Sequence, residues 1–487
     1  MIIEQTLTYY IANQFFEKTC IVRLNKLEQT IQAISKKERR LFAEYIASPF
    51  FNKREDAVRL YEWLQHGKRL EPKEAVFGHV YPGAAFDRQR LSLAMSYLQR
   101  LTEQFLAYRH WRSKPFAYDI DLVQVFRQRG LVVHFEEALR TAKNSLEHQP
   151  LRNGEYYTCQ GQLLWEEARF GQKNNSTEIR ILSQLSDNAD LLWVTQKLHY
   201  LCLLRTQQML YQSEEEIRLS REIEEILARY KLLEIPSVAI WYYCLKMLEN
   251  PDSPEYFSKF KQPLLEQGQM FDTAEIRDLF LFAINHCIRQ VNEGHTSFFH
   301  DIMDFYKDGL TKGYLLENGV LSRFTYHNIV AAGLQTLEFE WVEDFIARYK
   351  NALERAYRDS SYSFNRARLE FKRKRYGDAL ELLQHTNYYD PLLSLAARTM
   401  SLKIYYELNE FDLLYSHLEA LKNYIRRKTV LGYHRANYLN LVRYTQKLIS
   451  INLSDKAEVE SLRQKIQAEP VLTEREWLLE QLSALRH

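Results

Sequence analysis

Glycine and proline are both scarce in this sequence of 487 residues, which contains 15 glycines and 11 prolines. Folds rich in β-strands need many tight turns and therefore many of both residues, so the shortage favours helices joined by short connections. Apolar residues make up 46% of the chain and charged residues 26%, which is a globular composition. Because the chain is too long for one ordinary core, we expect several domains or an array of repeats.

Cysteine is also rare, and the five thiols form no CxxC pair. An odd number without paired spacing argues against a disulfide framework, so we expect reduced and buried thiols. No run approaches 18 apolar residues, and we therefore expect no membrane span. The first twenty residues lack a basic stretch followed by a clean apolar one. We accordingly expect no secretory signal and a cytoplasmic protein.

The charges nearly balance, with a formal net charge of +2. A balance of this kind excludes a bulk electrostatic attraction to nucleic acid or to a membrane surface, although local patches remain possible. We therefore expect no membrane partner and do not expect nucleic acid as the principal one.

Motifs for catalysis and cofactor binding are missing. The sequence has no GxGxxG, GxxxxGK[ST], GxSxG or HExxH pattern. One group of possible metal ligands does cluster in the sequence, comprising His286, Cys287, His295, His300, Asp301 and Asp304. Its spacings match no standard ligand pattern, so we interpret these side chains as ordinary core and surface residues. We expect a protein that is not an enzyme and that binds no cofactor or metal.

Helix starts are marked by capping boxes, in which Ser, Thr or Asp is followed three residues later by Glu. Such pairs are Ser35 with Glu38, Ser213 with Glu216, Asp272 with Glu275, Asp455 with Glu458, and Thr473 with Glu476. Their spread along a chain poor in glycine and proline predicts an all-α protein without a sheet.

The segment 87–110 has the clearest helical pattern. Apolar residues recur at alternating spacings of three and four: Leu91, Ala94, Leu98, Leu101, Phe105 and Tyr108. Such a stripe packs against another helix. We favour packing within the chain, and a dimer seam is the alternative, because similar stripes form coiled coils.

Internal repetition indicates how the helices are arranged. Cys159, Cys202, Cys244 and Cys287 follow one another at intervals of 43, 42 and 43 residues, each within an apolar stretch that precedes a second amphipathic run. We interpret them as small apolar residues at helix contacts. Stacked repeats would keep them too far apart to share one zinc, because each helix adds roughly 8–10 Å.

Further repeats are marked by aromatic residues. Phe339, Tyr376 and Phe411 each begin an amphipathic run, and they are separated by 37 and 35 residues. Upstream, residues 119–129 and 134–147 are predicted to form another helix pair.

The segment 361–393 resembles a tetratricopeptide repeat. Ala367, Tyr376, Ala379 and Pro391 stand at the separations of that family's small residue, turn aromatic, second-helix alanine and closing proline. The resemblance implies a right-handed α-solenoid of stacked antiparallel helix pairs over residues 116–430. Residues 1–115 would then form an N-terminal helical domain, and residues 431–487 capping helices.

The N-terminal block resembles uncharacterised bacterial helical-repeat proteins, on the segments 34–53, 73–91 and 93–109. Within it, residues 73–109 have the pattern helix, short turn, helix, and the second helix begins with Arg88, Gln89 and Arg90. This pattern supports an alternative function, a DNA-binding transcriptional regulator with a helix-turn-helix and a repeat sensor domain.

The densest charge run is basic and comprises Arg366, Arg368, Lys372, Arg373, Lys374 and Arg375. One interpretation is a solvated helix end, where cations stabilise the helix dipole. The other is a groove for an acidic protein or peptide, because the tetratricopeptide resemblance implies that Arg368 and Lys372 border the concave surface. Arg398, on the next first helix, is predicted to lie beside them. A protein-binding scaffold or adaptor is therefore the function we expect.

Overall fold

A computed structural model provides the structure of the chain. It describes residues 25–65, 69–173, 179–211, 220–384, 388, 390–427, 434–452 and 455–484. The N-terminal segment with Cys20, and the predicted cap at Ser213 and Glu216, lie outside the described residues.

The described residues form 23 α-helices, three short 3-10 helices and one small β-hairpin. The predicted all-α class is therefore confirmed, but the expectation of no sheet is wrong. Strands β1 (Leu316–Glu317) and β2 (Val320–Leu321) pair antiparallel. Asn318 and Gly319 join them, both with positive φ (52° and 81°). Asn-Gly is the preferred pair for such a two-residue turn, because both positions need a left-handed backbone.

The chain divides into two compact units. Among the described residues, the N-terminal unit comprises those up to residue 196, and the C-terminal unit comprises those from residue 197 onwards. Helix α10 (Ile179–Tyr211) runs through the boundary without a break and contains neither glycine nor proline. The sequence predicted a break between the amphipathic run that follows Cys159 and the apolar stretch around Cys202. The structure places both in the single helix α10. A division after residues 115 and 430 stays a prediction.

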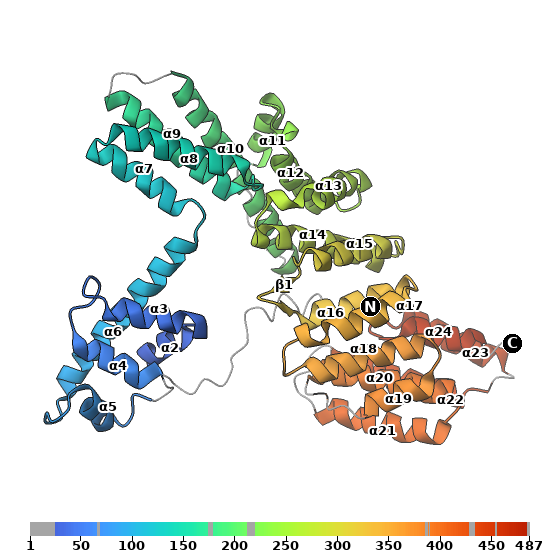
Figure 1. Cartoon of the computed structure of the whole chain (residues 1–487). Helices are drawn as coiled ribbons and strands as arrows, with labels where there is room; N and C mark the ends of the chain where they lie inside the picture. Colours follow the sequence, from blue (N-terminus) through green and yellow to red (C-terminus); the bar gives the residue numbers. More distant parts are fainter. Residues whose placement is uncertain are drawn as a thin grey trace. The chain divides into compact units, whose positions relative to one another are not determined.

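The N-terminal unit begins with a cluster of helices that share one core (Figure 1). The helices of this unit before α10 are α2 (Lys26–Ala33), α3 (Lys36–Ala47), α4 (Glu55–Gln65), α5 (Lys73–Val80), α6 (Arg88–Ser113), α7 (Ala117–Arg129), α8 (Val132–His148) and α9 (Gly154–Lys173). Five residues of the predicted α6 stripe are buried in this core, from Leu91 to Phe105. Tyr108 is 44% exposed. Packing within the chain is therefore confirmed for the stripe up to Phe105. The predicted pair at 119–129 and 134–147 is also present, as α7 and α8.

Side-chain caps account for several helix starts. Ser35 and Asp272 form complete capping boxes with Glu38 and Glu275. Asp455 accepts hydrogen bonds from the backbone N–H groups of Ala457 and Glu458. The predicted cap at Thr473 is one residue early, because α24 begins at Arg475.

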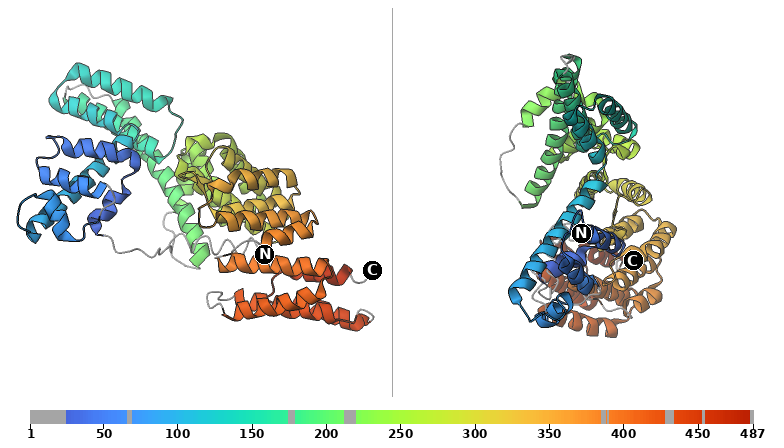
Figure 2. Two further views of the ribbon diagram at one scale, coloured as in Figure 1. Left: turned by 60° about the horizontal axis from the view of Figure 1, so that its bottom comes forward. Right: turned by 60° about the vertical axis from the view of Figure 1, so that its left-hand side comes forward.

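The C-terminal unit is a succession of helix pairs. After α10 come α11 (Ser220–Arg229), η1 (Leu232–Glu234), α12 (Pro236–Glu249), α13 (Pro254–Gln267), η2 (Gly268–Met270), α14 (Thr273–Asn292), α15 (Phe298–Thr311), α16 (Arg323–Gln335), α17 (Phe339–Tyr349), η3 (Lys350–Ala352), α18 (Arg358–Lys372), α19 (Tyr376–Gln384), α20 (Pro391–Glu407), α21 (Phe411–Arg427), α22 (His434–Ser450), α23 (Lys456–Ala468) and α24 (Arg475–Ala484). Each helix from α12 to α21 packs against the next one in sequence, and α22 packs against α24. The pairs α16/α17, α18/α19 and α20/α21 lie in successive layers in both Figure 1 and Figure 2.

These three pairs share one turn geometry. Leu337, Lys374 and Asn409 all adopt a left-handed backbone conformation, with φ of 61°, 61° and 58°. Two residues later, the second helices begin at the predicted aromatics Phe339, Tyr376 and Phe411. In each turn the residue before the aromatic donates its N–H to a carbonyl five residues earlier in the chain. Such a left-handed end is a common way to stop a helix. The aromatic spacing thus identified three helix pairs whose turns have the same geometry.

All four described cysteines are free and buried, as predicted. The cysteines were predicted to be kept apart by the stacking of helices. This is wrong for Cys202 and Cys244, whose thiols lie next to each other between α10 and α12. Burial raises the pKa of the Cys244 thiol, and the neighbouring Cys202 adds to the effect. None of the described helices combines the length and the apolar character that crossing a bilayer requires.

Candidate binding groove

The first helices of the last three pairs, α16, α18 and α20, line a pocket of about 200 Å³. Tyr438 of α22 and the segment Thr473–Glu474 between α23 and α24 complete its wall. The apolar part of the lining includes Leu334, Phe371 and Met400. The pocket therefore crosses three successive helix pairs.

Arg368 is the central cation of the pocket. Its Nη1 donates hydrogen bonds to the backbone oxygen of His327 at 3.0 Å and to Asn365 Oδ1 at 3.2 Å. Burial lowers the pKa of Arg368 to about 10, although the charge of Glu474 opposes the effect. Among the described residues, no carboxylate lies within ion-pair distance of this guanidinium. A partly buried cation without a counter-ion attracts an anion.

Two lysines accompany Arg368. Lys372 lies one helical turn further along α18 and is exposed, and Lys403 reaches the pocket from α20. The Lys403 ammonium lies 2.9 Å from Glu474 Oε2 and 5.3 Å from the centre of the Phe371 ring. Three cations thus face one carboxylate in this lining.

The polar side chain of Thr399 also belongs to the pocket. The residue is only 4% exposed, and its hydroxyl has no hydrogen-bond partner within the described structure. Unsatisfied buried hydroxyls are uncommon, because leaving one without a partner costs about 1–3 kcal/mol. Thr399 and Lys403 are four residues apart on α20, so both side chains lie on the face that lines the pocket.

Arg398, the third cation predicted for this site, lies elsewhere. Its guanidinium is 4.7 Å from the centre of the Tyr424 ring on α21, and its backbone oxygen is 2.8 Å from His417 Nε2. Arg398 precedes Thr399 by one residue, which turns its side chain by about 100° around α20. The pocket therefore unites Arg368 and Lys372 with Lys403.

The three other arginines of the basic run do not line the pocket and are bound to carboxylates, whereas Lys374 is exposed. Arg366 and Arg373 bind Glu343 of α17 at 2.5 and 2.7 Å. Arg366, Arg373 and Arg375 also surround Glu370, whose side chain is 4% exposed. Their charges are therefore used to hold α18 against its neighbours.

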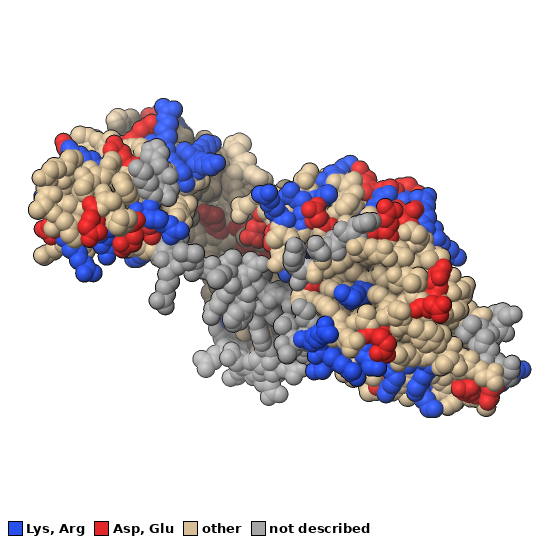
Figure 3. Space-filling model, turned by 90° about the horizontal axis from the view of Figure 1, so that it is seen from below, with Lys and Arg blue, Asp and Glu red and all other residues tan. Residues whose placement is uncertain are grey.

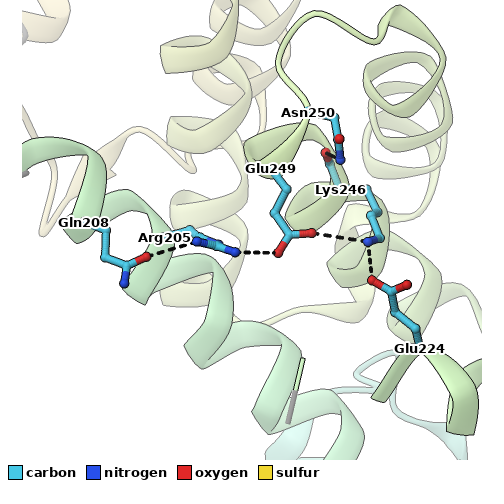
Figure 4. A network of polar contacts seen from close by, with 6 residues as sticks. All are labelled: Arg205, Gln208, Glu224, Lys246, Glu249 and Asn250. Carbon is cyan, nitrogen blue, oxygen red and sulfur yellow. Dashed lines mark hydrogen bonds and ion pairs between the residues drawn. The ribbon is translucent and has the colours of Figure 1, made fainter. Parts of the chain in front are cut away.

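A second charge network, in Figure 4, shows what a satisfied arrangement looks like. Arg205 of α10 binds Glu249 of α12 at 3.2 Å, and Glu249 also binds Lys246 at 3.2 Å. Lys246 in turn binds Glu224 of α11. Burial tends to lower the pKa of Lys246, but its two carboxylate partners outweigh burial and raise it. Each charge here has an opposite partner, so the network ties three helices together and leaves no cation for a ligand.

The suspected metal ligands between residues 286 and 304 serve other roles. His286 stacks on Phe257 with 5.0 Å between ring centres. Asp301 and Asp304 both bind Lys261 at 2.7 Å. In the described parts of the chain, no group of three or more His, Cys, Asp or Glu side chains is arranged to hold a metal ion.

The residues suggested for DNA contacts begin α6. Asp87 caps this helix by accepting hydrogen bonds from the backbone of Gln89 and Arg90. Arg88, Gln89 and Arg90 are exposed, and the Arg90 guanidinium lies 4.0 Å from the centre of the Tyr81 ring. Exposure leaves these side chains accessible, but nothing in this geometry selects a nucleic acid.

The surface charges are mixed. On the face seen in Figure 3, basic and acidic side chains are interspersed over the part of the surface that the structure describes. Comparison of the chain with protein-family models, with curated proteins and with solved structures gave no match. The groove is therefore the feature of the described chain that bears most directly on function.

Proposed function

We propose that the chain is a non-enzymatic protein–protein interaction scaffold that binds an acidic segment of a partner protein in the groove along α16, α18 and α20. The proposal includes a tetratricopeptide-like, right-handed solenoid for the repeat array, with its first helices on the concave side. Solenoids of this kind present extended surfaces, because each repeat contacts only its neighbours. The step from fold to function is an analogy, so the chemistry of the groove has to support it.

The single observation that supports the proposal best is the state of Arg368. Its guanidinium is partly buried, lines an open pocket and has no carboxylate at ion-pair distance among the described residues. Arginine is well suited to bind a carboxylate, because its planar fork donates two parallel hydrogen bonds. The unpartnered hydroxyl of Thr399 offers one more polar contact in the same pocket.

Charge and shape together favour an acidic segment that also carries apolar side chains. The charged groups of the pocket are Arg368, Lys372, Lys403 and Glu474, so positive charge exceeds negative. Aromatic and aliphatic side chains form the remainder of the wall. Exposed ion pairs contribute only about 0–1 kcal/mol each, so affinity requires apolar contacts beside the charges.

The alternative function, a DNA-binding transcriptional regulator, remains a prediction without an observation that favours it. The exposed residues at the start of α6 could contact many kinds of partner, and their geometry does not select DNA among them. The scaffold is preferred, because the pocket has a partly buried cation without a counter-ion and the start of α6 does not.

Defined peptides test the proposal. Short fluorescein-labelled peptides, amidated at the C-terminus, would alternate Glu with Phe, and matched peptides would carry Gln in place of Glu. We expect the full chain to bind the Glu peptide more tightly than the Gln peptide in fluorescence anisotropy. Arg368→Gln should weaken binding about ten- to hundredfold, because charge-assisted hydrogen bonds of about 1.5–3 kcal/mol are lost.

Arg426→Gln is the matched control, since Arg426 is an exposed arginine in the last turn of the second helix α21. It removes the same charge outside the pocket and should leave affinity unchanged. Equal affinity for the Glu and Gln peptides would overturn the proposal, and so would equal effects of the two substitutions. Circular dichroism would verify that each variant keeps its helix content.

A further inference from the structure

Glu474 contributes the one carboxylate in the lining of the pocket. It lies directly before α24, in the segment that closes the groove after α23. Its backbone adopts a left-handed conformation with φ of 56°. This conformation is uncommon for a residue other than Gly, Asn or Asp and persists only when the surroundings hold it in place.

The contact that Glu474 makes is partly buried and charged. Its Oε2 lies 2.9 Å from the Lys403 ammonium, and both side chains are less than one fifth exposed (18% and 17%). Glu474 also favours the charged form of Arg368 through space, against the effect of burial. It therefore partly neutralises the pocket that we assign to a partner's carboxylates.

Other contacts hold this segment to α20 without Glu474. Trp477 of α24 packs edge to face on Tyr406, with 5.4 Å between ring centres. Gln481 donates a hydrogen bond of 2.8 Å to Glu407. Because these contacts hold α24 on α20, the Glu474 carboxylate is not required for docking. Its position in the pocket calls for a separate explanation.

We propose that Glu474 is an internal substitute for a carboxylate of the partner, so that an acidic segment must displace it from Lys403 to bind fully. This inference rests on the proposed function and adds a partner chemistry and a regulatory contact. The partner segment carries two carboxylates next to an apolar side chain. One binds at Arg368, Lys372 and Thr399, and the other replaces Glu474 at Lys403.

Removing the internal carboxylate should therefore strengthen binding. We expect Glu474→Gln to increase the affinity of the full chain for the alternating Glu–Phe peptide by about three- to tenfold, since the competing ion pair is lost. Glu474→Gly should do the same, because glycine adopts a positive φ without strain. Glu480→Gln, an equal change of charge at an exposed position of α24, should leave the affinity unchanged.

The outcomes separate the two proposals. Weaker or unchanged binding by both Glu474 variants, with Arg368→Gln still weakening binding, would overturn the internal substitute and leave the groove in place. A gain in Glu480→Gln equal to that in Glu474→Gln would also overturn it, because overall charge would then explain the result. If neither the wild type nor the Glu474 variants distinguish the Glu peptide from the Gln peptide, both proposals fall.

Discussion

At the scale of single residues, His286 shows how packing controls a titratable group. It lies on α14, is 6% exposed, stacks on the ring of Phe257 and meets the ring of Phe298 edge to face. Burial, followed by the charge of Arg289, lowers its pKa to about 4, against the opposing charges of Glu293 and Asp301 among others. The folded protein therefore keeps this imidazole neutral at a pH where an unfolded chain would protonate it.

Acid should destabilise the fold through His286. Its pKa is lower in the folded state than the ordinary 6.5, so the unfolded chain binds more protons below that pH. The contribution of neutral His286 to the free energy of unfolding is fully present above about pH 6.5, and it is lost as the pH falls through about 4. Replacing the group by Phe, which keeps the stacking, should remove this part of the decline, amounting to about 3 kcal/mol at full protonation.

The measurement is the midpoint of urea unfolding at a series of pH values between neutral and mildly acid. His286→Phe should become less sensitive to pH than the wild type, whereas His300→Phe, at an exposed position of α15, should not. Parallel pH profiles for the wild type and His286→Phe would contradict the assignment.

At the scale of helices and turns, the aromatic spacing proved more informative than the choice of individual side chains. Lys403 stands thirty-five residues after Arg368, which is the spacing between Tyr376 and Phe411. Phe364 and Thr399 are also thirty-five residues apart. Phe364, Arg368, Thr399 and Lys403 all line the pocket. Applying the repeat spacing to Arg368 would therefore have selected Lys403 in place of Arg398.

Other features of the elements were harder to derive from sequence. The hairpin at Asn318–Gly319 carried a recognisable turn signal, but its strands have only two residues each. The partnering of Glu343 with Arg366 and Arg373 depends on which faces of α17 and α18 meet, and periodicity does not determine that. Glu474 lines the pocket from the segment directly before α24, about 100 residues after Arg368 in the sequence, and local patterns do not predict such a contact. Local patterns thus predicted helices and repeats, and tertiary contacts determined the site.

Gly333 tests the close packing of one helix pair. It lies inside α16, where an added Cβ would collide with Val342 of α17. We expect Gly333→Ala to destabilise the protein by about 1–3 kcal/mol, because overpacking outweighs the gain in helix propensity of about 1 kcal/mol.

Gly377→Ala is the matched control. Gly377 lies in α19, and nothing approaches within 4 Å of its added Cβ. This substitution should be neutral or stabilise the fold by up to about 1 kcal/mol. Urea unfolding of both variants measures the difference, and equal effects would show that α16 and α17 are not in the close contact described.

At the scale of the whole molecule, charge is distributed without a dominant sign. The 65 basic and 63 acidic residues leave a net charge of only +2. The local arrangement of charged side chains therefore determines which partners are attracted. In the C-terminal unit three of the six residues of the basic run, Arg366, Arg373 and Arg375, are bound to Glu343 or Glu370. Arg368 and Lys372, which line the groove, are not among these bound residues, so we expect the groove to favour a short acidic segment over a long polyanion.

Binding of duplex DNA at the start of α6 would favour the alternative function. Proteins that bind duplex through many phosphates lose affinity steeply with salt, since each contact releases counterions. Arg88 and Arg90 are exposed at the start of α6, but Arg90 packs on Tyr81, and the carboxylate of Asp87 caps the same helix end. We therefore expect the full chain to show no duplex binding in a gel-shift or anisotropy titration at physiological salt. Binding of the acidic peptide by the same preparation would show that the protein is active. Tight, salt-sensitive duplex binding that Arg88→Gln and Arg90→Gln abolish would instead favour the DNA-binding regulator over the scaffold.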